Sequence, residues 1–172
     1  MAHQSTRPTT TAPDLEPAAG SRTWVPPYRV LVGIAYAVCV LGMSLSIIAE
    51  MQTGYVGSGE QPRSLGEQLV GVLGFGTLGL LLSVGAVWLF GRKLQRAGLG
   101  AVVMGVLSVP ALAFFWCGMP ALLGAAAAHL AGLTRDGRPV AGAPRLFGMV
   151  GLVFAVLNPL ANFTAVTVSW LL

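Results

Sequence analysis

Charged residues are scarce in this chain of 172 amino acids, because Lys, Arg, Asp and Glu together make up only 9% of it. A water-soluble domain usually carries about 25% charged residues, so this chain cannot cover a solvated surface. That scarcity excludes an ordinary cytosolic enzyme, a nucleic-acid-binding domain and a disulfide-stapled secreted module. Hydrophobic residues reach 55%, and 23 glycines accompany them. This composition predicts an all-α, polytopic integral membrane bundle whose main surroundings are the lipid bilayer.

The residues that support catalysis are also sparse. No apolar stretch carries Asp or Glu in its interior, and the chain has no H-E-x-x-H motif, no P-loop and no G-x-S-x-G elbow. Two cysteines, Cys39 and Cys117, give neither a disulfide framework nor metal-ligand spacing. We therefore expect a non-enzymatic protein with no catalytic residue, no bound metal and no cofactor.

Apolar runs predict five transmembrane helices, at about 30–49, 69–90, 99–115, 119–133 and 146–171. The third and fourth come from one apolar stretch, Leu99 to Leu133. As a single helix it would be about 52 Å long, against about 30 Å of hydrocarbon. Gly118 and Pro120 predict a tight turn within it, although an unbroken helix, and hence four spans, is the alternative. The polar residues 50–68 predict a loop, and Asn158-Pro159 predicts a bend in the last span.

The N-terminal segment differs in composition from the rest. Residues 1–28 are rich in Thr, Pro, Ala and Ser and lack apolar periodicity, which predicts a disordered tail rather than a signal peptide. Residues 29–172 are expected to form the bundle.

The distribution of basic residues predicts the orientation. With five spans and a cytoplasmic N-terminus, nine of the ten basic residues lie inside and Arg63 alone lies outside. With four spans the ratio falls to six against four. Arg outnumbers Lys nine to one and Ala and Gly are plentiful, which hints at a bacterial origin. We therefore predict a multi-pass protein of the bacterial inner membrane with an extracytoplasmic C-terminus.

Small residues recur at intervals of four, a spacing that lets membrane helices approach closely. Internal packing is the preferred interpretation, and an interface with a partner or a second copy is the alternative. The predicted packing positions are Gly124, Ala128 and Gly132; Gly79 and Ser83; Ala101 and Gly105; and Gly151 and Ala155.

Two sets of polar residues are candidate sites. His129 is the only histidine within a predicted span, close to its cytoplasmic end, where it suits interfacial hydrogen bonding or a proton or ligand role. Asn158 and Asn162 share one helix face near the middle of the bilayer. At similar depths lie Ser44, Thr77 and Ser108. These five residues could form a polar cluster at a Pro-broken helix, as in transporters, or the amides could bond across helices and hold them together.

The leading interpretation is an accessory, scaffold or assembly subunit that associates with another membrane protein or as a homo-oligomer. The alternative is a small permease or channel for an uncharged or weakly polar solute. A third possibility is a redox or quinone-associated helper that acts through His129. Nucleic acid is not expected as a partner, because the basic residues sit in small groups between apolar runs.

Overall fold

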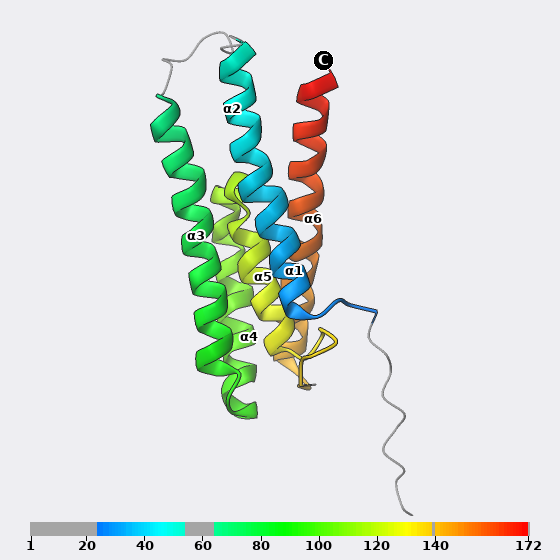
Figure 1. Ribbon diagram of the computed structural model, residues 1–172. Coiled ribbons are helices and arrows are strands. Elements are labelled where there is room, and N and C mark those ends of the chain that lie inside the picture. The colour runs from blue at the N-terminus through cyan, green and yellow to red at the C-terminus, as the bar shows by residue number, and fades with distance from the viewer. Residues whose placement is uncertain (1–23, 54–63, 139, 172) are drawn as a thin grey trace, which may run out of the picture.

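The computed structural model describes residues 24–53, 64–138 and 140–171. These residues are almost entirely helical and contain no β-strand. The first long helix runs through α1 (Tyr28–Ala35), a π-helical segment η1 (Tyr36–Gly42) and α2 (Met43–Thr53). The second is α3 (Leu65–Phe90), and the last is α6 (Ala143–Leu171), which stays helical through Pro159. The three long helices stand side by side (Figure 1).

A shorter pair of helices lies between α3 and α6 in the chain. It consists of α4 (Leu94–Ser108), the 3₁₀ helix η2 (Pro110–Cys117) and α5 (Met119–Leu130). The axis bends by 71° between α4 and η2. Gly118 then reverses the chain with φ of 74°, a left-handed conformation that glycine adopts without steric cost. The apolar stretch from Leu99 to Leu133, which could have been one helix or two, is thus a helical hairpin. In Figure 1, α4 rises and α5 descends beside it.

Three helices are long and apolar enough to cross a membrane, within residues 28–49, 66–90 and 143–168. The count rises to four if the bent pair of α4 and η2 is one span. The prediction of five spans is therefore not confirmed. The reason is α5, whose 12 residues extend only about 18 Å, well short of about 30 Å of hydrocarbon.

The tip of the hairpin lies halfway along the long helices. A Cβ added to Gly118 would come within 2.5 Å of Cys39 Cβ, and one added to Gly76 would lie 3.2 Å from the Cys117 carbonyl oxygen. Asn158 donates to the carbonyl of Phe115. These contacts fall near the middle of the first helix, of α3 and of α6.

Beyond the tip, the three long helices are the only described elements that continue. The remaining stretches run from Cys39 to Thr53, from Gly76 back to Leu65 and from Asn158 to Leu171. At 1.5 Å per residue, each extends about 16 to 21 Å past the tip. The described part of the bundle therefore has one half that contains the hairpin and one half that does not (Figure 1).

The core is built around α5. Every residue from Met119 to Ala128 is buried, and most of them are alanine, glycine or leucine. Such small side chains let α3, α4 and α6 approach the α5 backbone closely, which is how helices associate where no water is present to drive them together. A helix this short is thereby enclosed on all sides.

Some boundaries differ from the predicted ones. The predicted loop at 50–68 is helical at both ends, since α2 continues to Thr53 and α3 begins at Leu65. Ser64 and Glu67 form a capping box that satisfies the first N–H groups of α3, a local signal that apolar periodicity overlooked. The predicted disordered tail lies largely outside the described residues, which begin at residue 24.

Candidate functional site

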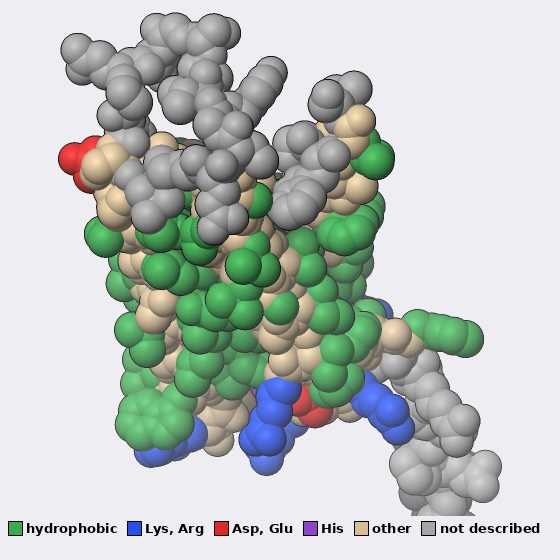
Figure 2. Space-filling view, turned by 45° about the horizontal axis from the view of Figure 1, so that its top comes forward, with side chains coloured by type: hydrophobic (Ala, Val, Ile, Leu, Met, Phe, Trp, Pro, Cys, Tyr) green, Lys and Arg blue, Asp and Glu red, His purple; other side chains and the backbone are tan. Residues whose placement is uncertain are grey.

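Basic side chains gather at one end of the bundle, where α1 and α6 begin and where α3 turns into α4. We call this the basic end. Its Lys and Arg residues are Arg29, Arg92, Lys93, Arg96, Arg135, Arg138 and Arg145. On the face seen in Figure 2, Lys and Arg side chains gather below a broad band of hydrophobic side chains. The guanidinium of Arg92 lies 4.1 Å from the ring centre of Trp88, a pairing suited to a membrane–water interface.

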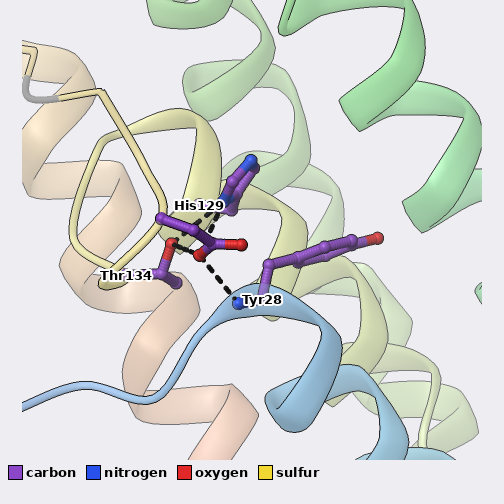
Figure 3. A network of polar contacts seen from close by, with 4 residues as sticks. Tyr28, His129 and Thr134 are labelled. Carbon is purple, nitrogen blue, oxygen red and sulfur yellow. Dashed lines mark hydrogen bonds and ion pairs between the residues drawn. The ribbon is translucent and has the colours of Figure 1, made fainter.

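A polar network closes the basic end around the carboxylate of Asp136. Its Oδ1 accepts hydrogen bonds of 2.9 Å from the backbone N–H of Tyr28 and from the hydroxyl of Thr134. The Nδ1 atom of His129 lies 2.9 Å from the Thr134 hydroxyl and 3.5 Å from Oδ1. Figure 3 shows these contacts, which tie the start of α1 to the loop that follows α5.

The hydrogen-bond pattern determines the tautomer of His129. The Thr134 hydroxyl donates its single proton to the Asp136 carboxylate, so it can only accept a hydrogen bond from the imidazole of His129. Nδ1 of His129 is therefore the protonated nitrogen of the neutral ring, and Nε2 carries the free lone pair. The second ring nitrogen points away from the network in Figure 3.

A second chain of hydrogen bonds runs inward from the same tyrosine. The Tyr28 hydroxyl lies 2.9 Å from Ser83 Oγ, and Ser83 donates to the Leu122 carbonyl at 2.7 Å. The Tyr28 ring also lies 5.0 Å from the His129 ring, centre to centre. Tyr28 thus links α1 to α3, α5 and the loop after α5.

Asp136 is the negative centre of the network. Burial alone would raise the pKa of its carboxyl, but the hydrogen bonds from the Tyr28 N–H and the Thr134 hydroxyl outweigh that effect and lower the pKa below its usual value. The carboxylate is therefore ionised at neutral pH. Its side chain is 43% exposed, so it also faces solvent.

A cavity of about 220 Å³ opens beside the network at the basic end. Its wall combines apolar surface from the turn between α3 and α4 with three polar side chains. The lining residues are Gly91, Leu94, Ala97, His129, Leu130, Asp136 and Arg138. We call this cavity the basic-end pocket.

The two asparagines predicted for the midplane bind the hairpin tip. Nδ2 of Asn158 and Nδ2 of Asn162 donate to the Phe115 carbonyl at 2.9 and 3.1 Å. That carbonyl belongs to the irregular η2 segment and also receives the Gly118 N–H. The amides therefore satisfy backbone groups at a helix break, where an unpaired carbonyl would be costly in lipid. Cys39 adds a weak S–H contact of 3.6 Å to Asn158.

The other three predicted midplane residues do not join this pair. Ser44 donates to the Val40 carbonyl in its own helix, and Ser108 donates to the Gly105 carbonyl in α4. Thr77 is exposed and lies 3.2 Å from the hydroxyl of Tyr36. The structure thus brings together two of the five residues.

Glycines of the predicted packing positions lie at close backbone contacts between helices. A Cβ on Gly124 would meet the Gly151 carbonyl oxygen, and one on Gly105 would lie 2.9 Å from Phe147 Cβ. A Cβ on Gly79 would lie 3.2 Å from a methyl of Leu122.

The other predicted packing positions have several roles. Ala101, Ala128 and Ala155 are buried, and Ser83 is part of the hydrogen-bond chain described above. Gly132 differs from the prediction, because with φ of 71° it ends α5 in a Schellman motif.

Metal-ligating residues are dispersed. Across the parts of the chain that the structure describes, no three His, Cys, Asp or Glu side chains are placed to hold an ion. Cys39 and Cys117 are both free and buried at the hairpin tip.

A scan against protein-family models, a search of curated proteins and a search of solved structures found no match to this chain. Its function is therefore inferred from the geometry of its own residues.

The sequence indicates His129 as a candidate but does not indicate its partners, Asp136 and Tyr28. A local signal did exist, since Asp136 is the only acidic residue in the loop after α5 and lies seven positions from His129. The contact with Tyr28, 108 positions away, has no such signal.

Proposed function

We propose that the chain sits in the bacterial inner membrane with its basic end in the cytoplasm and its C-terminus outside. The positive-inside rule supports this orientation. In this arrangement three helices cross the bilayer, and the hairpin of α4, η2 and α5 enters from the cytoplasm and returns to it. Every loop keeps the side that five spans would give it, because a re-entrant hairpin and two full spans both return the chain to the same side.

Within this topology, we propose a non-enzymatic accessory subunit of a membrane complex. The observation that carries the proposal is the exposed face of α6 beyond the level of the hairpin tip. In α3, Val72 is the outermost buried residue among those described, and in α6 that residue is Asn162. Past this level, Phe163, Thr164, Ala165, Thr167 and Val168 of α6 are all exposed.

A transmembrane helix of another membrane protein is the partner that suits this exposed face. Lipid gives apolar helices no hydrophobic reason to associate, so close packing and small residues decide where a partner binds. Ala165 lies about 60° around α6 from the buried Asn162, on the side that continues the packed face outward. Thr164 lies about 160° away, towards lipid.

Photo-crosslinking in intact membranes tests this role. A photoreactive residue at position 165 should give one discrete adduct with a membrane protein that also copurifies stoichiometrically in mild detergent. The same residue at position 164 is the matched control and should react with lipid. Lipid adducts alone at both positions would refute the proposal, and an adduct with a second copy of the chain would replace it by a homo-oligomer.

The permease interpretation draws less support from the geometry. It required Ser44, Thr77, Ser108, Asn158 and Asn162 to line one path, whereas Ser44 and Ser108 bond within their own helices. Both asparagine amides already hold the hairpin tip. The redox interpretation depends on Nε2 of His129, because Nδ1 is engaged by Thr134.

A further inference from the structure

We propose that the basic-end pocket binds a phosphoethanolamine group, the headgroup of an aminophospholipid in the cytoplasmic leaflet. The proposal concerns the opposite end of the bundle from the partner site and does not depend on it.

The pocket carries two opposite charges that do not neutralise each other. Asp136 and Arg138 both line it, yet among the described residues no salt bridge joins the two. A carboxylate and a guanidinium on one wall suit a ligand that is itself zwitterionic. A purely anionic ligand would meet the negative charge of Asp136.

Hydrogen-bonding capacity identifies the cationic part as a primary ammonium. The contacts of Asp136 with Tyr28, Thr134 and His129 all fall on Oδ1, which leaves Oδ2 to accept from a ligand. His129 also lines the pocket, and its Nε2 is a second acceptor there. A primary ammonium offers three N–H donors to these acceptors, whereas the trimethylammonium of phosphocholine offers none. The guanidinium of Arg138 is suited to the phosphate, which it can bind through two parallel N–H groups.

Position and size agree with a lipid headgroup. The pocket opens at the level of Arg92 and Trp88, whose pairing marks the membrane–water interface. Leu94 lines it and is 53% exposed, which provides apolar surface for the glycerol and upper acyl region. A cavity of about 220 Å³ accommodates one headgroup and not a whole lipid.

Native mass spectrometry of the full chain, released from nanodiscs, tests the assignment. From discs with equal parts of phosphatidylethanolamine, phosphatidylcholine and phosphatidylglycerol, the wild type should retain one phosphatidylethanolamine. Arg138→Gln should lower that retention about tenfold, because one charge-assisted contact is lost. The matched control, Arg135→Gln, removes a charge from the same loop but not from the pocket, and should behave as wild type.

Two further experiments test the role of Asp136 and distinguish a lipid headgroup from free phosphoethanolamine. Asp136→Asn should abolish the preference for phosphatidylethanolamine over phosphatidylcholine, and circular dichroism will show whether this variant is folded. Soluble phosphoethanolamine should compete at millimolar concentration, and competition without any retained lipid would mean that the ligand is the free phosphate ester. Equal retention of all three lipids, preference for phosphatidylglycerol, or an unchanged Arg138→Gln variant would overturn the assignment. None of these results bears on crosslinking at position 165.

Discussion

Gly118→Ala is the substitution that most directly tests the hairpin turn. Gly118 has φ of 74°, and a side chain in this left-handed region costs about 1 to 2 kcal/mol. Its new Cβ would also lie 2.5 Å from Cys39 Cβ, an overlap with an atom that is fixed to the helix backbone. Forcing extra volume into a packed core costs about 1 to 3 kcal/mol. Together these effects predict a loss of about 2 to 5 kcal/mol in the free energy of unfolding.

The assay is unfolding in mixed micelles of dodecyl maltoside and sodium dodecyl sulfate, followed by circular dichroism. Gly85→Ala is the control, because a Cβ there meets nothing within 4 Å. It should be neutral or stabilising by up to about 1 kcal/mol.

A second substitution at Cys39 separates the two causes. Cys39→Gly removes the overlapping Cβ and should recover the packing part of the loss in the double variant, beyond its own helix-propensity cost of about 1 kcal/mol. Cys39→Ala keeps that Cβ and relieves only the longer contact of 3.1 Å with Sγ, so it should recover less than Cys39→Gly does. If Gly118→Ala were as stable as Gly85→Ala, the close approach of hairpin tip and first helix would be refuted.

Three further predictions concern the polar contacts and the orientation. Asn162→Leu removes one of three donors to the Phe115 carbonyl, which Asn158 and Gly118 still satisfy, and should destabilise the protein by about 0.5 to 1.5 kcal/mol; an unchanged unfolding curve would contradict the role of the amide at the tip. Asp136 has a lowered pKa in the folded state, so its stabilising effect is present above the unfolded-state value of 3.8 and is lost as pH falls through the folded pKa. The stability difference between wild type and Asp136→Asn should therefore be constant near neutral pH and vanish in acid, and a difference that persisted in acid would exclude the ionised carboxylate as its source. An alkaline phosphatase fusion at Leu172 should be active in cells, whereas a fluorescent fusion that glows there would reverse the orientation.

Local patterns in the sequence were sufficient to predict the all-helical fold and the turn at Gly118. They also placed Asn158 and Asn162 on one face, and these residues do act together. Each of these features depends on residues close in the chain, where helical periodicity and the conformational freedom of glycine operate directly.

The depth of the turn was not predictable in the same way. Splitting residues 99–133 at the turn invites the assumption that each half crosses the bilayer, because a short apolar segment has no mark that distinguishes a span from a re-entrant helix. Tertiary packing determines the depth of the turn, because Phe115 contacts α6 and Gly118 contacts the first helix near the middle of each helix. The network at Asp136 was also not predictable from the sequence, because its contact with Tyr28 joins distant parts of the chain.

The proposed topology and the proposed partner site on α6 both require that the hairpin ends in the middle of the membrane. Cysteine labelling in intact cells tests it, with Phe115→Cys introduced into a chain whose Cys39 and Cys117 are replaced by alanine. Phe115 is 52% exposed at the tip and should face lipid, so a membrane-impermeant maleimide should not label it. Leu171→Cys, which is predicted to lie outside, should be labelled readily in the same cells. Labelling of position 115 from outside, at a rate similar to that of position 171, would place the turn at the outer surface and contradict the account.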